Sequence, residues 1–151
     1  TATGYMGGHS PNPTYEQVCS HSTGHAETVR VVFDTALTSA ADLVRLFFEI
    51  HDPTQVGGQG NDIGDQYRSA IWTTTPEQLR DATALRTAYQ EVLTKRGFGP
   101  IQTVISPAPD ADSTTRFWYA EDYHQQYLFK NPGGYECHAR TGVACPALPH
   151  E

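Results

Sequence analysis

The sequence is organised around residues 59–72, QGNDIGDQYRSAIW, a polar stretch with two glycines that runs into an apolar one. Gly60 and Gly64 allow a tight turn or a close approach of the backbone to a ligand. The carboxylates, amides and phenol around them supply hydrogen-bond donors and acceptors. One interpretation is a solvated loop at the edge of a sheet. The other is one wall of a pocket, whose second wall comes from the polar, aromatic residues 11–27.

Strands and amphipathic helices alternate on both sides of this stretch. Ser39 is the expected N-cap of a helix over residues 40–49, and Thr75 and Gln78 form a capping box for the clearest helix, residues 76–95. The other predicted elements are strands over residues 1–5, 28–34, 67–73 and 102–106 and short helices over 15–18 and 120–129. This order predicts an α/β or α+β fold, in which helices pack on a small mixed sheet in two layers.

Length and composition indicate a single domain over residues 1–151, with a core of reasonable size. Hydrophobic residues make up 38% of the chain, and 13 glycines and 10 prolines predict many loops. Aromatic residues, at 11%, are too frequent for a disordered chain. The irregular segment 131–151 is expected to be a mobile C-terminal tail.

Charge and hydropathy exclude several classes of partner. The formal net charge is −7 and the basic residues are not clustered, which argues against a nucleic-acid partner. No apolar run is long enough to span a membrane, and no secretory signal is recognisable. The sequence therefore predicts a cytoplasmic protein with no membrane partner.

The three cysteines do not suggest a disulfide scaffold. Cys137 and Cys145 lie in the irregular tail, where exposed, flexible thiols favour exchange chemistry. Incidental thiols are the alternative interpretation. The histidines show no metal-ligand spacing, and neither a Cys-x-x-Cys nor a His-Glu-x-x-His motif is present, so we expect no metal.

Three side chains are candidates for acid–base or hydrogen-bonding roles. Glu27 lies where a loop enters a strand, and burial there would raise its pKa and keep it protonated near neutral pH. Tyr15 and Tyr67 are flanked by polar residues, so their hydroxyls can face a ligand. We therefore expect Glu27 to be largely buried beside both phenols. The alternatives are a solvated strand-edge glutamate and two core tyrosines.

A set of short motifs, read together, resembles one family over nearly the whole chain. These motifs are Gly4-Tyr5-Met6-Gly7-Gly8, Asn12-Pro13-Thr14-Tyr15-Glu16-Gln17-Val18-Cys19, Thr23-Gly24-His25-Ala26-Glu27, His51-Asp52-Pro53-Thr54-Gln55, Gln59-Gly60-Asn61-Asp62, Gln66-Tyr67-Arg68-Ser69-Ala70-Ile71, Tyr123-His124-Gln125-Gln126-Tyr127-Leu128, Lys130-Asn131-Pro132 and Thr141-Gly142-Val143. In this order they resemble the A-type peptide methionine sulfoxide reductases.

The resemblance implies a ferredoxin-like sandwich without metal or organic cofactor. It implies that a thiolate attacks the sulfur of the S epimer of methionine sulfoxide, while Glu27, protonated, serves the sulfoxide oxygen. Tyr15, Tyr67 and Asp62 would hold that oxygen and the pocket. Methionine sulfoxide in peptides and proteins is then the substrate, free methionine sulfoxide included.

The resemblance also assigns the thiols. Cys137 and Cys145 match the family's resolving cysteines, which thioredoxin would reduce by exchange. The family's nucleophile belongs to a Gly-Cys-Phe-Trp motif before Gly4-Tyr5, so we expect it outside these 151 residues. Cys19 matches a cysteine that is not the nucleophile. Two other functions stay open: a non-catalytic protein that binds methionine sulfoxide, and a general thiol oxidoreductase using the tail pair alone.

Overall fold

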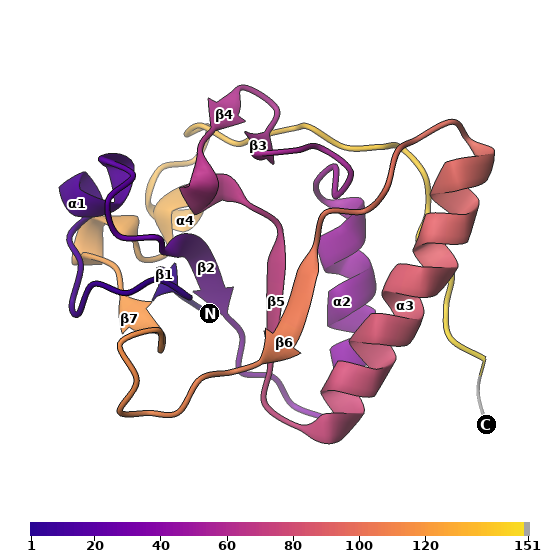
Figure 1. The fold of residues 1–151 in the computed structure, drawn as a ribbon, viewed down its shortest axis with the longest axis horizontal. Helices are drawn as coiled ribbons and strands as arrows, with labels where there is room; N and C mark the ends of the chain where they lie inside the picture. The colour runs from indigo at the N-terminus through magenta and orange to yellow at the C-terminus, as the bar shows by residue number, and fades with distance from the viewer. Residues whose placement is uncertain (150–151) are drawn as a thin grey trace.

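The structure is a computed structural model that describes residues 1–149. One half of it, called the strand half below, is built on a three-stranded antiparallel sheet (Figure 1). Its central strand is β1 (Ala2–Met6), which pairs with β2 (Ala26–Arg30) on one side and with β7 (Trp118–Tyr119) on the other. The short helix α1 (Tyr15–Cys19) belongs to the same half.

The other half, called the helical half, contains the parallel strands β5 (Ala70–Thr73) and β6 (Val104–Pro107). Helices α2 (Ala40–Glu49) and α3 (Pro76–Lys95) pack together, and α3 also contacts both strands (Figure 1). Thr75 caps α3 by accepting the Gln78 N–H, but the Gln78 side chain accepts the Thr74 N–H rather than that of Thr75, so only half of the predicted capping box is present. The core of this half consists of Phe48, Leu85, Tyr89, Leu93 and Cys145.

A two-stranded hairpin, β3 (Gly58–Gln59) and β4 (Asp62–Ile63), is formed by the polar stretch on which the sequence is organised. Its turn passes through Gly60, whose φ of +56° favours glycine. A 3₁₀ turn, η1 (Asp65–Tyr67), then leads towards β5. Another 3₁₀ turn, η2 (Asp122–His124), and the short helix α4 (Tyr127–Lys130) precede the tail.

The tail has no helix or strand between residues 131 and 149, and residues 150 and 151 lie outside the described part. It starts in the strand half and crosses to the helical half along the hairpin side of the molecule (Figure 1). The tail therefore connects the two halves.

The predicted mixed α+β class is confirmed, and its strands are distributed over three small sheets in residues 1–149. Helices α2 and α3 have the predicted bounds because their caps and apolar faces agree. The strand predicted over 28–34 is wrong in its bounds: pairing with β1 ends at Arg30, and Val32 is exposed. The helix predicted over 120–129 is also wrong, because Gln126 adopts a left-handed conformation that separates η2 from α4.

Candidate active site

Four predicted residues converge on one region from four different elements. Glu27 is on β2, Tyr15 begins α1, Asp62 is on β4 and Tyr67 ends η1. The charge of Glu27 raises the pKa of both Tyr15 and Tyr67, and the charge of Asp62 raises the pKa of Glu27. These mutual effects place the four side chains within electrostatic range of one another.

Glu27 is exposed, so our expectation that it is largely buried is wrong. The reason is its position on β2, which is an edge strand of the three-stranded sheet within residues 1–149. Its pKa is nevertheless raised, first by the desolvation that the surrounding protein imposes and then by the negative charge of Asp62. A proton on Glu27 is thus favoured, and the side chain stays accessible to a ligand.

Cys19 lies beside Tyr15, one helical turn further along α1. A side-chain hydrogen bond with Cys19, followed by the charge of that thiol and then burial, raises the pKa of Tyr15 to about 12. Cys19, which the resemblance gives as a cysteine other than the nucleophile, is therefore adjacent to the pocket. Its spacing of four residues from Tyr15 puts both on one face of the helix, a signal that the sequence carried.

The pKa of Tyr67 is raised by burial first, and then by the charges of Glu27, Asp62 and Cys19. Both phenols therefore keep their protons at neutral pH and can donate hydrogen bonds. When Glu27 is protonated, the three side chains form a set of O–H donors in one region. Such a set suits an oxygen atom that gains negative charge during a reaction.

The tail returns to the site through Tyr135 and Cys137. The Tyr135 hydroxyl donates to Asp62 Oδ2 over 2.9 Å, which raises the pKa of Tyr135. The Cys137 Sγ donates a weak hydrogen bond of 3.6 Å to the Gln59 carbonyl. At Gly60, a Cβ would lie 3.2 Å from that sulfur, so the hairpin turn and Cys137 are in close contact. The sequence did not identify Tyr135 as a contact of Asp62.

Cys145 is in a different place. Its side chain is 1% exposed in the core of the helical half, where our expectation of an exposed thiol is wrong. Burial, and then the charge of Glu49, raises the pKa of Cys145 to about 11, although Arg45 acts against this. The Cys145 N–H donates to Glu49 Oε1 over 2.8 Å, and Arg45 Nε donates to the Cys145 carbonyl over 3.2 Å. All three cysteines are free thiols.

A hydrogen-bond network around the Glu121 carboxylate, which the sequence did not reveal, adjoins the site at Tyr15. Glu121 Oε1 accepts the Tyr5 hydroxyl over 3.0 Å, and Glu121 Oε2 accepts the Tyr15 N–H over 3.0 Å and the Tyr123 hydroxyl over 3.3 Å. Desolvation opposes the ionisation of Glu121, but these hydrogen bonds and one from its own backbone outweigh it and lower its pKa. Tyr5 is directly opposite Glu27 in the β1–β2 pairing.

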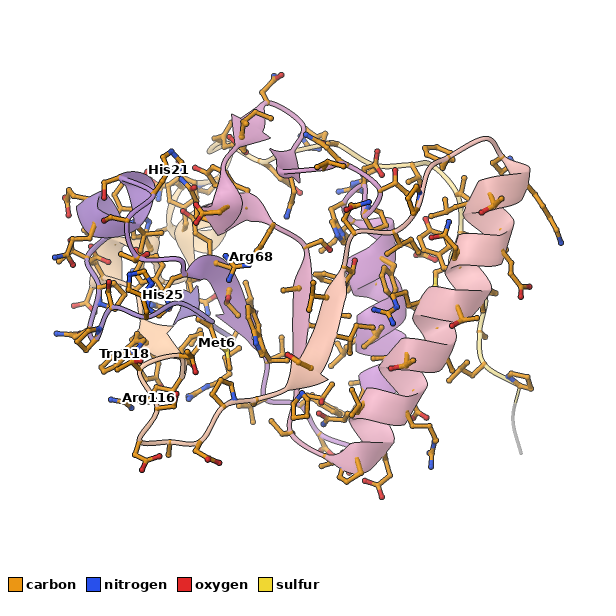
Figure 2. All side chains as sticks on the ribbon, viewed as in Figure 1. Met6, His21, His25, Arg68, Arg116 and Trp118 are labelled. Atoms are coloured by element: carbon orange, nitrogen blue, oxygen red, sulfur yellow. The ribbon has the colours of Figure 1, made fainter. Side chains whose placement is uncertain are left out.

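Two buried histidines have structural hydrogen bonds at both ring nitrogens. His25 Nδ1 accepts the Gly8 N–H over 3.0 Å, and its Nε2 donates to the Ser10 carbonyl over 2.8 Å. His51 Nδ1 donates to a backbone carbonyl and its Nε2 pairs with the Ser69 hydroxyl. Figure 2 shows His25 beside the three-stranded sheet and His21 out at α1. Within residues 1–149, no three His, Cys, Asp or Glu side chains gather as metal ligands would.

No helix among the described residues is both long and apolar enough to cross a membrane. Next to the three-stranded sheet, Arg116 lies 4.0 Å above the ring of Trp118 (Figure 2). Trp118 is directly opposed to Tyr5 in the β1–β7 pairing, so it lies on the same face of the sheet as Tyr5 and Glu27.

Comparison with known proteins identifies the family. A sequence model described as peptide methionine sulfoxide reductase matches residues 1–148. The peptide methionine sulfoxide reductase MsrA of Azorhizobium caulinodans is 56% identical over 147 residues, which cover 97% of this chain and 64% of that protein. The chain therefore spans less than two thirds of the length of that relative.

Solved structures agree with this assignment. Methionine sulfoxide reductase A of Corynebacterium diphtheriae superposes with a TM-score of 0.82 at 44% identity, covering 98% of this chain and 71% of that one. The reduced form of Mxr1 from Saccharomyces cerevisiae gives 0.79 at 34% identity, covering 92% and 75%. With the fold, the motifs and these matches in agreement, the chain belongs to the peptide methionine sulfoxide reductase family.

Proposed function

We propose that the protein reduces the S epimer of methionine sulfoxide, free or within proteins, to methionine by thiol chemistry. The observation that carries this proposal is the convergence of Glu27, Tyr15 and Tyr67, each with its pKa raised, on one accessible region. The two phenols remain protonated at neutral pH, the raised pKa of Glu27 favours its protonated form, and a sulfoxide oxygen is an acceptor that gains charge as its S–O bond breaks. No cofactor is required for this chemistry.

The proposed reaction balances as an oxygen transfer. A thiolate sulfur attacks the sulfoxide sulfur and forms an S–S bond, while the sulfoxide oxygen takes a proton and leaves as its S–O bond breaks. A water or hydroxide oxygen then attacks the thiol sulfur and the S–S bond breaks, so that methionine is released and the attacking thiol becomes a sulfenic acid. Glu27 would supply the proton that the oxygen needs, and Tyr15 and Tyr67 would donate hydrogen bonds to it. Asp62 favours the protonated form of Glu27 through its charge.

Two thiols compete for the role of nucleophile. The family resemblance assigns it to a Gly-Cys-Phe-Trp motif, which these 151 residues do not contain. The alternative is Cys19, because its thiol hydrogen-bonds to Tyr15. We propose the first, in which Cys19 only adjoins the pocket. The variant Cys19→Ser should then retain reduction, whereas loss of all reduction would identify Cys19 as the nucleophile.

We further propose that Cys137 condenses with the sulfenic acid, releasing water and forming a disulfide. Its contact with the hairpin turn beside Asp62 supports this role. Cys145 would then attack that disulfide, and thioredoxin, acting in the cytoplasm, would reduce the resulting Cys137–Cys145 disulfide. The burial of Cys145 means that the tail has to leave the helical core before this exchange.

The test is stereospecific turnover by the protein expressed from its complete gene. Peptides with purified S or R methionine sulfoxide are incubated with dithiothreitol, and methionine is quantified by mass spectrometry. We expect turnover of the S epimer alone, with a large loss in Tyr67→Phe and none in the matched change Tyr127→Phe. Absence of turnover, or equal reduction of both epimers, would contradict the proposed function.

A further inference from the structure

Glu121 occupies an unusual position between two secondary-structure elements. It lies just after β7, separated from it by Ala120, and its two carboxylate oxygens accept hydrogen bonds from a buried strand residue and from the first residue of α1. The strand residue, Tyr5, is 2% exposed. Glu121 therefore connects α1 to the central strand of the sheet.

The backbone N–H of Tyr15 needs this acceptor. The first N–H groups of any helix have no partner inside the helix. In α1, the Thr14 hydroxyl accepts the Gln17 N–H over 3.3 Å, and the Gln17 side-chain oxygen accepts the Thr14 N–H over 2.9 Å. Glu121 accepts the Tyr15 N–H, so it determines where this residue lies relative to the sheet.

The ring of Tyr15 is held by the same segment. His124, three residues after Glu121, packs against it with the two rings tilted by 54° and their centroids 4.7 Å apart. Ala120, immediately before Glu121, is buried with Tyr5 and Val18, and Tyr15 packs against this cluster. Residues 120–124 thus contact Tyr15 through its backbone and its ring.

Tyr5 makes this arrangement rigid relative to the proposed acid. Directly opposed residues of an antiparallel pair lie on the same face of the sheet, and Tyr5 is opposed to Glu27. A short path therefore runs from Glu27 across the sheet to Tyr5, then through its hydroxyl to Glu121 and on to Tyr15. This path fixes the distance between two groups that the proposed reaction needs together.

We propose that Glu121 is a positioning residue that holds the Tyr15 hydroxyl in register with Glu27 at the sulfoxide oxygen. This inference rests on the proposed function, because it assumes that Tyr15 donates to that oxygen. Without the Glu121 carboxylate, the first turn of α1 loses its attachment to the sheet. The Tyr15 hydroxyl is then no longer held within hydrogen-bond distance of the sulfoxide oxygen while that oxygen gains negative charge. The rate of the chemical step then falls, while substrate affinity changes little.

A double-mutant cycle in the complete protein tests this. The single-turnover rate constant is measured for wild type, Tyr15→Phe, Glu121→Ala and the double variant, with Glu121→Gln as the conservative change. We expect about a tenfold loss in Glu121→Ala and a smaller loss in Glu121→Gln, whose amide oxygen still accepts the Tyr15 N–H. In the Tyr15→Phe background, Glu121→Ala should cost less than about twofold, because its effect passes through that hydroxyl.

Glu16→Gln is the matched control, because this exposed glutamate is adjacent to Tyr15 but does not contact its N–H. It should leave the rate constant unchanged. If Glu121→Ala lowers the rate as much in the Tyr15→Phe background as in wild type, the positioning role is contradicted. Thermal unfolding of each variant separates this result from a general loss of folding.

A second measurement does not depend on activity. 3-Fluorotyrosine at position 15 reports the surroundings of that ring by ¹⁹F NMR, and its resonance should move in Glu121→Ala but not in Glu16→Gln. A moved resonance in a protein without reductase activity would contradict the proposed function, and only the structural contact between Glu121 and Tyr15 would stand. An unmoved resonance in an active protein would contradict the positioning role alone.

Discussion

Cys137 and Cys145 are eight residues apart in the tail, but Cys137 lies against the β3–β4 hairpin and Cys145 lies in the core of the helical half. Cys137 is partly exposed against the β3–β4 turn, close to Asp62. Cys145 is buried among apolar side chains, and two hydrogen bonds of its backbone attach it to α2. The same irregular segment thus places the Cys137 thiol next to the candidate site and buries the Cys145 thiol in the core of the helical half.

This difference shows that the two halves have separate tasks. The strand half contains the charged and phenolic groups, mostly on short strands, turns and one short helix. The helical half supplies apolar packing, and the tail contributes to it through Val143, Cys145 and Leu148. For Cys145 to take part in thiol–disulfide exchange, its part of the tail therefore has to separate from this apolar core. Three experiments test this contrast, and they are given in order from the largest expected effect to the smallest.

Replacing the proposed acid should have the largest effect. We expect Glu27→Ala to lower the single-turnover rate about a thousandfold, the usual size of a lost general acid. Glu27→Gln should lose less, because its amide still donates a hydrogen bond to the oxygen. Quenched-flow measurement of methionine provides the rates. Equal losses in the two variants would show that hydrogen-bond donation is not the role of this side chain.

The buried thiol should react far more slowly than a free one. A thiol pKa raised to about 11 leaves little thiolate at pH 7.5, so iodoacetamide should modify Cys145 roughly a hundredfold or more slowly than in the urea-unfolded chain. The rate should rise with pH up to about 11, because the thiolate fraction rises until the pH reaches the folded-state pKa. Peptide mapping measures each cysteine separately. Fast labelling of Cys145 at neutral pH would show that it is not held in the core.

The smallest effect concerns the attachment of the tail to the hairpin. Tyr135→Phe removes the hydroxyl that bonds to Asp62, and this side chain is exposed. We expect recycling by thioredoxin to slow about threefold, because an exposed hydrogen bond contributes little. The first turnover should keep its rate. A loss in the first turnover instead would place Tyr135 among the groups that act on the substrate.

Local signals predicted the helices of this protein better than its contacts. The bounds of α2 and α3 followed from Ser39 and Thr75, because caps and apolar periodicity act within a few residues. The four pocket residues were found through motifs, and the structure brings them into one region. Their individual roles stay predictions until variants are measured.

Contacts between residues far apart in the chain could not be predicted from the sequence. The burial of Cys145 depends on a core formed more than fifty residues earlier, and the tail itself has no periodicity to reveal it. Glu121 could not be matched with Tyr5 because the pairing of β1 with β7 joins opposite ends of the chain. The position of Cys19 was available from its helical spacing and was overlooked.

The most direct measurement of the central claim separates the first turnover from recycling in the variant with both Cys137→Ser and Cys145→Ser. The reduced protein is mixed with excess S-sulfoxide peptide, first without reductant and then with thioredoxin and its reductase. The account predicts one equivalent of methionine at the wild-type rate in the first case, and no further turnover in the second. Continued thioredoxin-driven turnover, or loss of the first equivalent, would contradict the division of labour between the two halves.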